Sequence, residues 1–525
     1  MKRLVVCCDG TWNNPDQEDN GMPSPTNVFK IFNAIADNDF ENDSKQLKYY
    51  HPGVGGEGGS INVITGGAVG AGISRHICNA YHWLGKNYEE GDEIYLFGFS
   101  RGAFTARSLG AFVGRGLLNL RNLSDSEAWE RVHRAYYQGY RSERVRLIDW
   151  ADYDWSFFHQ NDVTENRSTP IHFIGVWDTV GSLGVPDDLE VFNFFDDEDK
   201  WRFHDTALGN HVKFARHAMA IDEKRSSFSV TRWSNVKNHP NILECWFPGV
   251  HSDVGGGYSE CSLANGALLW MIEECERVTG LKFREGIKDT IKENSLGVLH
   301  NSYKGMFSKL RSRPRNIPAM VTDNENLFHS SALSRQAASP IAYSPYWQTK
   351  MLKEGEAITV EIFASKHWNY TGLYLQKDQK FIFSAQGEWL DANDSCSWMG
   401  TEDDKFTVGD VFRGIGTFLG KFESLAEKLT RNELMDIWGT KRVESINWFA
   451  MVGAIANDNG VDSKEVVKND GSPVKHQHLD LTKYQDQNEP FTVTKPGYLY
   501  CFPNDVWSLY GNNRGSVSLT ITCLA

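Results

Sequence analysis

The segment Glu93–Arg107 constrains the fold of this chain more than any other feature. It reads EIYLFGFSRGAFTAR, so a strand-like apolar run meets a Gly-x-Ser-x-Gly pattern and then a helix-like run. A serine between two glycines can occupy a sharp strand-to-helix turn, because glycine tolerates the crowded backbone of such a turn. The turn raises the hydroxyl above a sheet and places it at a helix N-terminus, whose N–H groups can stabilise an oxyanion. The segment therefore predicts Ser100 as a nucleophile; a glycine-rich turn with an idle serine is the alternative.

Strand and helix patterns alternate through the first part of the chain. Short apolar strands are expected at 4–8, 48–51, 94–99, 171–177 and 242–247, and helices after Thr26, over 68–88 and over 104–118. Such alternation indicates an α/β fold with a doubly wound parallel sheet and right-handed crossovers. We expect this domain to span residues 1–345. A polar, aromatic-rich stretch at about 119–168 interrupts it and is read as an insertion over the carboxyl edge of the sheet, either a lid or a structural decoration.

The pattern changes after about residue 345. Short strands such as 359–363, 380–383 and 516–522 are separated by Gly, Asn and Asp turns, which predicts an antiparallel β-sandwich over residues 346–525. One amphipathic helix is expected to be inserted at about 410–435. Its apolar stripe favours inward packing, with membrane or partner docking as the alternative.

Composition narrows the function classes. A chain of 525 residues is too long for one ordinary core, and its net charge of −14 argues against nucleic acid as a partner. The nine cysteines show no CxxC or Cys/His metal spacing, so buried, reduced thiols are expected. The N-terminal apolar run is too short for a signal peptide, and no apolar stretch approaches the ~20 residues that span a bilayer. We expect synthesis in the cytoplasm and, if the protein is exported, a route without a signal peptide.

A serine nucleophile needs a base and an acid that orients the base. In doubly wound hydrolases these follow later strands in the order Ser, Asp, His. Asp178 comes directly after the expected strand 171–177, and His251 lies just past the strand 242–247 on a glycine-rich loop. We therefore predict a Ser100–Asp178–His251 triad. Asp253 and Asp222 remain competitors for the role of the acid.

The oxyanion of such a reaction needs two backbone donors. One is the N–H of Arg101, next to the nucleophile. The other is expected from Gly10 or Thr11, in the loop after the first strand. A simple Asx turn at Asp9 is the alternative interpretation of that loop. No phosphate-binding loop competes, because the glycine-rich stretch 53–59 lacks the Lys-Ser/Thr pair that follows in such a cradle.

Four motifs in order make the sequence resemble a known family. They are Cys8–Asn13 (CDGTWN), Gly98–Ala103 (GFSRGA), Gly175–Gly181 (GVWDTVG) and Gly249–Gly256 (GVHSDVGG). Together they resemble the α/β-hydrolase domain of type VI secretion phospholipase effectors over roughly residues 1–340. The resemblance implies phospholipase A activity on bacterial glycerophospholipids, a Ser–Asp–His triad and no cofactor for catalysis. It also implies delivery on a VgrG spike into the periplasm of a rival cell, and a cognate immunity protein in the producer.

The C-terminal part resembles a different family. The segment Asn504–Ser516 (NDVWSLYGNNRGS) is similar to the calcium loop of the galactose-binding bacterial lectin PA-IL. Hard oxygen ligands, which calcium prefers, are offered by Asp505, Asn512 and Asn513. The resemblance implies further carbonyl ligands from Leu509 and from near Asp391. The second sugar-contacting loop of the lectin is not recognisable, because the region 403–446 stands in its place, so the resemblance supports Ca²⁺ more than a glycan.

The residues and both resemblances lead to one reading: a lipolytic serine hydrolase that acts on phospholipid at a membrane surface, fused to a lectin-like sandwich that targets or docks it. A carbohydrate-ester or polymer esterase with a glycan-binding module is the alternative among enzymes. A carbohydrate-binding or adaptor protein with an inactive hydrolase half is the alternative outside enzymes.

Overall fold

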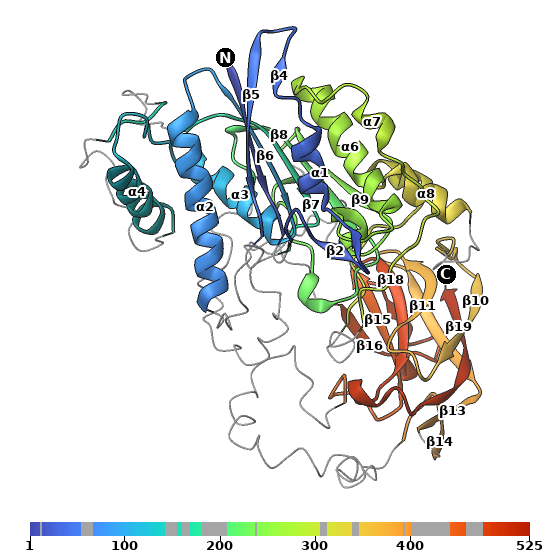
Figure 1. Ribbon diagram of the computed structural model, residues 1–525. Helices are drawn as coiled ribbons and strands as arrows, with labels where there is room; N and C mark the ends of the chain where they lie inside the picture. Colours follow the sequence, from blue (N-terminus) through green and yellow to red (C-terminus); the bar gives the residue numbers. More distant parts are fainter. Residues whose placement is uncertain are drawn as a thin grey trace.

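The computed structural model describes most of the chain. The described residues are 1–10, 13–53, 67–141, 155–159, 168–180, 207–236, 239–304, 312–338, 346–391, 394–401, 441–457 and 476–524. They form an α/β domain followed by a β domain, as the sequence predicts (Figure 1). The expected helix at about 410–435 lies outside the described residues.

The α/β domain is built on a mixed sheet. In the described part of the chain its strands follow the order β4-β5-β1-β6-β7-β8-β9. All neighbours pair in parallel except β4, which is antiparallel to β5. The bounds are Lys2–Cys8 (β1), Asn38–Asp39 (β4), Ser44–His51 (β5), Glu93–Phe99 (β6), Ile171–Trp177 (β7), Val212–Ala220 (β8) and Ile242–Phe247 (β9).

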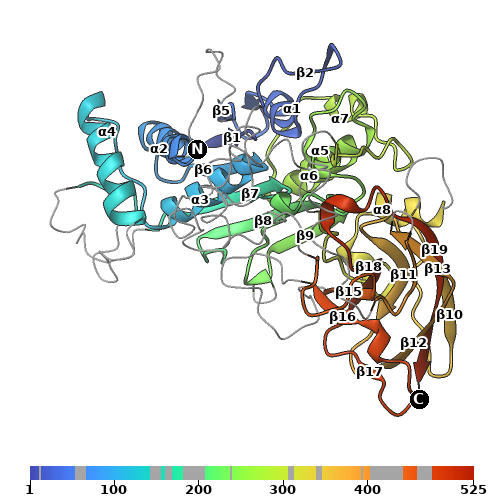
Figure 2. The same ribbon diagram turned by 90° about the horizontal axis from the view of Figure 1, so that it is seen from below.

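Helices cover both faces of this sheet, because the strands are apolar on both sides. In β1, Leu4 and Val6 belong to one buried cluster, whereas Val5 and Cys7 belong to the other. The first cluster is covered by α2 (Gly67–Asn87) and α3 (Arg101–Gly114), and the second by α1 (Asn27–Ala34) and α6 (Ser262–Thr279). Figure 2 shows this three-layered arrangement from below. The Thr26 hydroxyl caps α1 by accepting the N–H of Phe29.

The expected insertion at about 119–168 is described in part. It forms α4 (Asp125–Arg134) and a π-helix, Ala135–Tyr140. Ala128, Val132 and Tyr136 bury their side chains in the cluster that also contains α2 and α3. The figure places α4 on the outer side of α2 (Figure 1). The described residues of the insertion thus pack beside the helical layer and not over the carboxyl edge of the sheet.

Shorter elements complete the α/β domain. They are β2 (Glu18–Asp19), β3 (Met22–Pro23), a 3₁₀ turn at Ser226–Phe228, α5 (His251–Gly255), α7 (Ile287–Thr290), a 3₁₀ stretch at Thr322–Leu327 and α8 (Ser330–Ala337). An isolated parallel β-bridge joins Trp246 of β9 to Phe328, so the chain between the 3₁₀ stretch and α8 lies against β9.

Within its described residues, the β domain forms two packed antiparallel sheets. One joins β14, β13, β19, β12 and β17, with β10 also paired to β19; the other has the order β11-β18-β15-β16. In β19, residues Val517, Leu519 and Ile521 point into the core between the sheets, and the polar residues between them face outward. The bounds are Ala357–Phe363 (β10), Asn369–Leu375 (β11), Lys380–Gln386 (β12), Glu388–Asp391 (β13), Asp394–Ser397 (β14), Met451–Asn457 (β15), Gln477–Asp480 (β16), Phe491–Thr492 (β17), Gly497–Pro503 (β18) and Arg514–Leu524 (β19).

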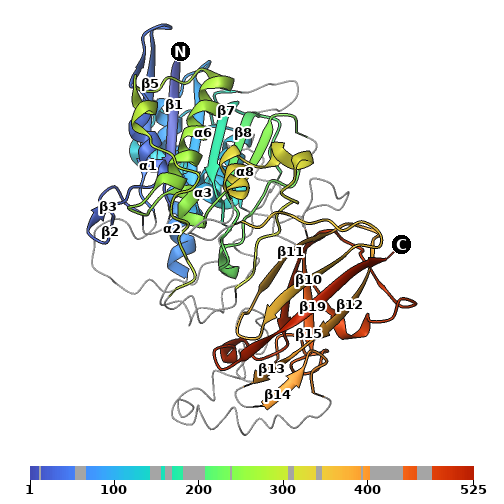
Figure 3. The same cartoon turned by 90° about the vertical axis from the view of Figure 1, so that its right-hand side faces the viewer.

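The β domain lies on the side of the α/β domain toward which the parallel strands run (Figures 1 and 3). The N–H of Met320 donates to the hydroxyl of Tyr498 on β18 at 2.8 Å, which fastens the connecting chain to this domain. All nine cysteines are free thiols, and seven of them are buried. None of the helices in the described ranges has the length and apolar character required to cross a bilayer.

Strand β8 and the start of helix α3 are among the elements of the α/β domain that differ from expectation. Strand β8 was not expected from the sequence, because it carries Arg216 and His217 in its middle. Both polar side chains have partners inside the fold: Arg216 pairs with Glu274 of α6 at 2.6 Å, and Nδ1 of His217 lies 3.4 Å from Oε1 of Glu244 of β9. Helix α3 begins at Arg101, three residues before the expected start, so that it follows Ser100 directly.

Candidate active site

Ser100 occupies the turn between β6 and α3, and its backbone is strained. Its φ of 57° and ψ of −125° lie in a region that a residue with a side chain seldom adopts. Such strain is typical of functional turns, where the surrounding structure holds the residue in place. Strand β7 provides part of that support, because the N–H of Ser100 donates to the carbonyl of Trp177 at 3.1 Å.

The two glycines of the pattern are required by close backbone contacts. A Cβ atom on Gly98 would lie 2.4 Å from the carbonyl oxygen of Gly102, and one on Gly102 would lie 2.2 Å from the carbonyl oxygen of Cys8. No side chain fits at such distances, because the opposing atoms belong to the backbone. The first helical turn of α3 therefore packs directly on β1 and β6 and fixes the place of Ser100 at the carboxyl edge of the sheet.

Asp178 and His251 come together at the same edge. Asp178 follows β7, the neighbour of β6, and His251 begins α5 after β9. The Nδ1–H of His251 donates to Oδ2 of Asp178 at 2.6 Å, and both side chains are buried. Because Nδ1 carries the proton, the neutral ring has its lone pair on Nε2. That nitrogen is buried and has no hydrogen-bond partner among the described residues.

Aromatic rings hold the imidazole of His251. The ring of Phe99 lies 4.5 Å from it, and the ring of Phe228 lies 5.1 Å away at a steep angle. Gly255, one turn later in α5, allows Phe99 to take this position, because a Cβ atom there would lie 1.9 Å from the phenyl ring. The imidazole is thus restrained by packing as well as by Asp178.

Arg315 is a member of the site that sequence reasoning missed. Its Nη1 donates to Oδ1 of Asp178 at 3.0 Å, and its Nη2 donates to Oδ2 at 2.9 Å. The same Nη2 donates to the carbonyl of Phe228 at 2.7 Å. Arg315 lies in the sequence SRPR, which carries no recognisable motif. Only the folded chain shows that a guanidinium binds both oxygens of the acid, including Oδ2, which also accepts from His251.

Burial and charge set the ionisation of the site. Burial alone would raise the pKa of Asp178, but Arg315 and His251 hold it well below its usual range. Burial lowers the pKa of His251, and the hydrogen bond and charge of Asp178 offset this only in part. At neutral pH the site therefore holds an ionised acid and a neutral imidazole, which is the form that can accept a proton.

The two competing acids have other partners. Asp253 accepts the ring proton of His300 at 2.6 Å and the N–H of Val250 at 3.0 Å. Asp222 accepts the hydroxyl of Tyr346 at 2.5 Å and the N–H of Gly249 at 2.8 Å. The structure thus brings Asp178, and neither of these residues, to the ring of His251.

Further polar groups support the loops that carry the site. Glu223 accepts the backbone N–H of His251 at 3.3 Å and the hydroxyl of Ser302 at 2.9 Å. Behind Asp178, the N–H of Thr179 donates to Nε2 of His217 at 3.1 Å. Sequence reasoning did not identify these groups, because each acts through contacts with residues far away in the chain.

The expected oxyanion donors are only partly described. The N–H of Arg101 lies at the first position of α3, directly after Ser100. Gly10 is next to the nucleophile, because a Cβ atom on it would lie 3.2 Å from Cβ of Ser100. Its N–H, however, already donates to Oδ1 of the preceding residue, Asp9, at 2.7 Å. Thr11 lies outside the described residues.

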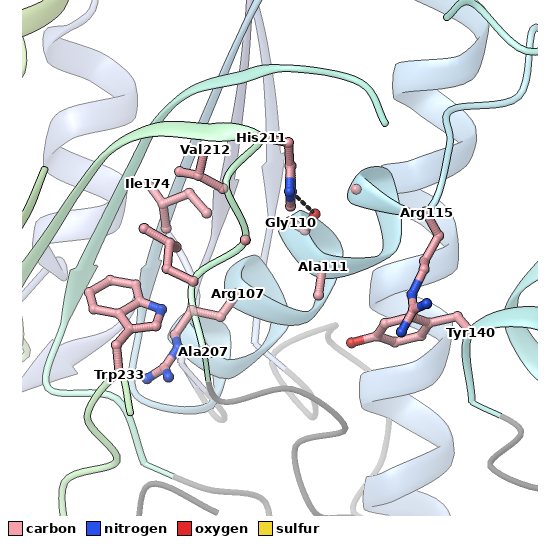
Figure 4. A pocket seen from close by; sticks show the side chains of 13 residues that line it. Arg107, Gly110, Ala111, Arg115, Tyr140, Ile174, Ala207, His211, Val212 and Trp233 are labelled. Carbon is pink, nitrogen blue, oxygen red and sulfur yellow. Dashed lines mark hydrogen bonds between the residues drawn. The ribbon is translucent and has the colours of Figure 1, made fainter. Parts of the chain in front are cut away.

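A cavity of about 330 Å³ lies at the other end of the sheet. It is lined by residues of α3 such as Arg107, by the chain that enters β8, which includes His211, and by Trp233 from the chain after β8 (Figure 4). His211 contacts the carbonyl of Gly110 at 2.9 Å there. The guanidinium of Arg107 donates to the carbonyl of Thr231 at 2.6 Å. This cavity is separate from the carboxyl edge that carries Ser100.

The predicted calcium ligands gather in the β domain. Asn513 donates to Oδ2 of Asp505 at 2.9 Å, and Asn512 donates to Oδ1 of Asp391 at 2.9 Å. The carbonyl of Leu509 accepts the N–H of Asn512 at 3.0 Å. Across the described ranges, no group of three or more His, Cys, Asp and Glu residues has metal-site geometry. The cluster here draws on amide and carbonyl oxygens in addition to its carboxylates.

Burial makes this cluster electrostatically unusual. The carboxyl of Asp505 is buried, and burial, together with the nearby charge of Asp391, raises its pKa to about 7. The side-chain oxygen of Asn513 is buried and has no hydrogen-bond partner among the described residues.

Comparison with known proteins places the α/β domain. A family model described as "T6SS, Phospholipase effector Tle1-like, catalytic domain" matches residues 2–274. "Uncharacterized protein YEL023C" of Saccharomyces cerevisiae (strain ATCC 204508 / S288c) is 30% identical over 258 residues, which are 46% of this chain and 34% of that protein. The chain thus spans about a third of the length of this curated relative.

Two solved structures are also similar to this chain. A crystal structure of an uncharacterized protein from Pseudomonas aeruginosa has 19% identity and a TM-score of 0.33, with 56% of this chain and 49% of that chain covered. A structure of the Tle1 effector bound to the VgrG spike from the type 6 secretion system has 19% identity and a TM-score of 0.29, with 49% and 51% covered.

The family model covers more than half of the chain and includes the segments of Ser100, Asp178 and His251. Its description implies an ester hydrolase. The chain belongs to the family of Tle1-like phospholipase effectors of type VI secretion systems, whose catalytic domain it carries at residues 2–274.

Proposed function

We propose that the chain is a phospholipase A that uses Ser100, His251 and Asp178 as a catalytic triad. The observation that carries this proposal is the buried 2.6 Å hydrogen bond between His251 and Asp178 at the sheet edge where Ser100 has a strained backbone. Ser100 Oγ attacks an ester carbonyl of the phospholipid while Nε2 of His251 takes its proton. The N–H of Arg101 stabilises the oxyanion that forms.

The reaction then proceeds through an acyl-enzyme. The imidazolium of His251 gives its proton to the leaving oxygen of the glycerol, so that the lysophospholipid departs and the acyl chain stays on Ser100. A water molecule, activated by the same imidazole, hydrolyses the new ester and releases the fatty acid. Asp178 remains ionised throughout and stabilises the imidazolium, which its low pKa supports.

The family supports bacterial membrane glycerophospholipids as the substrate class. We infer that the chain acts as an antibacterial effector in the periplasm of a target cell. The Tle1 effector in the similar solved structure is bound to a VgrG spike. We infer that a VgrG spike also carries this chain and that a cognate immunity protein protects the producer from it.

The direct test is hydrolysis of phospholipid vesicles by the purified chain and by Ser100→Ala. We expect the wild-type chain to release a fatty acid and a lysophospholipid. Ser100→Ala should lower the rate by a factor of about 10⁶, as in other hydrolases whose triad residues act together. Ser108→Ala, a buried serine two turns further along α3, is the matched control and should keep the wild-type rate. Equal rates for Ser100→Ala and the wild-type chain would refute the triad.

Product analysis separates this proposal from its alternatives. Release of acetate or another small acid from acylated carbohydrate, with no attack on phospholipid, would favour the carbohydrate-ester esterase. A folded wild-type chain with no activity on any ester would favour the adaptor protein.

We also infer that the β domain binds Ca²⁺ through Asp505, Asn512 and Asn513, with Leu509 and Asp391 nearby. The buried carboxyl of Asp505 and the unpartnered oxygen of Asn513 support this inference. A bound cation would compensate the charges of Asp505 and Asp391 and would accept the oxygen of Asn513 as a ligand. The ion would stabilise the loop that carries these residues; it takes no part in ester hydrolysis. Galactose is the probe that would test whether a glycan also binds there.

A further inference from the structure

The chain at residues 312–320 runs between the two domains and carries Arg315. It begins where the described residues resume after 304 and leads toward the 3₁₀ stretch at Thr322–Leu327. These residues lie beyond the 2–274 range of the family match. The segment contacts both domains, and each set of contacts fixes a different part of it.

On one side, the segment is bound to the loop that follows β8, which also contacts the backbone of His251. The N–H of Arg313 donates to the carbonyl of Lys224 at 2.7 Å, and Ser312 forms an antiparallel bridge with Arg225. Arg225 in turn pairs with Glu223 at 2.8 Å, and Glu223 accepts the backbone N–H of His251. From this position Arg315 reaches both oxygens of Asp178.

On the other side the segment is fastened to the β domain. The indole N–H of Trp368 donates to the carbonyl of Ser312 at 3.1 Å and lies 3.2 Å from its hydroxyl oxygen. Nε2 of His476 donates to the carbonyl of Pro314 at 3.1 Å, and Tyr498 accepts the N–H of Met320. Trp368, His476 and Tyr498 come from three separate stretches of the β domain. The backbone on both sides of Arg315 is therefore held by that domain.

We propose that the β domain completes the catalytic site by holding this segment so that Arg315 clamps Asp178 against His251. Arg315 is then a positioning residue, and the β domain is a working part of the hydrolase in addition to any docking role. This inference rests on the proposed triad. It concerns one feature that the triad alone does not require, namely a bidentate cation on the acid that is supplied across a domain boundary.

The guanidinium does two things at this site. Its two parallel hydrogen bonds fix the plane of the Asp178 carboxylate, and through it the ring of His251. Its positive charge also offsets part of the stabilisation that the negative charge of Asp178 gives to the imidazolium form of His251. The charged groups that act on His251 are Asp178 and Glu223, which favour its protonation, and Arg225, which opposes it. Arg315, bound to the same Oδ2 of Asp178 that His251 contacts, adds a second positive charge beside this carboxylate. Removal of Arg315 leaves the negative charges in excess, so His251 should hold its proton to higher pH.

The first test is the pH profile of kcat/KM for Arg315→Lys and Arg315→Ala. A lysine keeps a charge but cannot make the bidentate contact, whereas alanine removes both. We expect kcat to fall roughly 10- to 100-fold for Arg315→Lys, because Asp178 and His251 are then held less firmly in their reactive geometry. For Arg315→Ala the acid limb of the profile should move up by about one pH unit. Guanidinium ion, at concentrations far below those that unfold proteins, should restore part of the rate of the Arg315→Ala variant. Sodium chloride should not restore it.

The matched control is Arg313→Lys. Arg313 lies two residues away, is half-buried and donates to the hydroxyl of Ser229 in the α/β domain at 3.0 Å. It makes no contact with Asp178, so its pH profile should keep the wild-type midpoint. If Arg315→Ala folds and shows the wild-type midpoint and no response to guanidinium, the positioning role is refuted.

The second test addresses the β domain. Trp368→Phe keeps an aromatic ring and removes the hydrogen bond to Ser312. We expect a lower kcat and an acid limb displaced in the same direction as in Arg315→Ala. Trp389→Phe is the control, because this indole is buried in the same domain and its N–H has no partner among the described residues. Identical profiles for Trp368→Phe and Trp389→Phe would show that the β domain does not support Arg315.

The wild-type chain and Ser100→Ala are measured in the same series. An inactive wild-type chain, or an active Ser100→Ala, would refute the proposed triad itself. An active wild-type chain with an inactive Ser100→Ala, combined with unchanged Arg315 and Trp368 variants, would refute only the inference about the β domain.

Discussion

At the scale of single residues, the surroundings of each carboxylate decide what it does. Asp178, Asp222 and Asp253 all follow or border strand ends, yet only Asp178 is shared by His251 and Arg315. Chain order and the position directly after an expected strand favoured Asp178 in the sequence but left Asp222 and Asp253 as competitors. The Arg315 clamp could not be predicted, because the two residues are 137 positions apart and no pattern links them.

The first prediction at this scale concerns pH. Burial is the largest influence on His251 and brings its pKa below the usual 6.5. The neutral ring is the base, so kcat/KM should rise as the imidazolium loses its proton, with a midpoint below 6.5, and should stay level through about pH 8. A profile measured with a soluble short-chain ester checks this. A midpoint above pH 7 would contradict the assigned environment of His251.

Asp178→Asn gives the complementary prediction. Without the carboxylate, the imidazolium loses its main stabilising charge while Arg315 remains, so the acid limb should move to lower pH. This is the direction opposite to that expected for Arg315→Ala. The plateau rate should also fall by about 10⁴-fold, as when the acid of a Ser-His-Asp triad becomes an amide. A shift to higher pH in Asp178→Asn would mean that another acid faces His251.

At the scale of elements, most of the sheet could be predicted because its strands are continuous apolar runs between turn signals. Strand β8 was not predicted, because Arg216 and His217 interrupt its apolar run. Their partners, Glu274 and Glu244, are contributed by α6 and β9. The position of α4 beside the helical layer was not predicted, for a similar reason. Its sequence shows an amphipathic helix, but only packing shows that Ala128 and Val132 face the layer of α2 and α3.

The loop between β18 and β19 allows a prediction at this scale. A ligand that binds only the folded state at 100 times its Kd stabilises it by about 2.7 kcal/mol. Calcium should therefore raise the Tm of the β domain by several degrees relative to a chelator, and Asp505→Asn should remove the difference. Asp378→Asn, an exposed aspartate of the same domain, is the control and should keep it.

The pH dependence sharpens this test. Calcium needs the ionised carboxylate, and the pKa of Asp505 is raised to about 7. Protons should then compete with calcium, and the gain in Tm should shrink as the pH falls below 7. Equal melting curves with calcium and with chelator at pH 8 would mean that the loop is only a turn.

At the scale of the whole molecule, the change from strand–helix alternation to short strands made both domains predictable. Their contact was not, because it depends on single hydrogen bonds from Trp368, His476 and Tyr498 to one connecting segment. The sequence therefore suggested two modules with separate tasks. The structure instead joins them at the acid of the proposed triad, so that loss of the β domain should impair catalysis and not merely targeting.

The most direct test of the central claim is to locate the residue that a fluorophosphonate modifies in the full-length chain. Such reagents phosphonylate an activated serine. Mass spectrometry should find one adduct per chain, on the peptide that contains Ser100, with loss of ester hydrolysis in proportion to labelling and no adduct in Ser100→Ala. An adduct on a different serine, or an unlabelled chain that still hydrolyses phospholipid, would contradict the account.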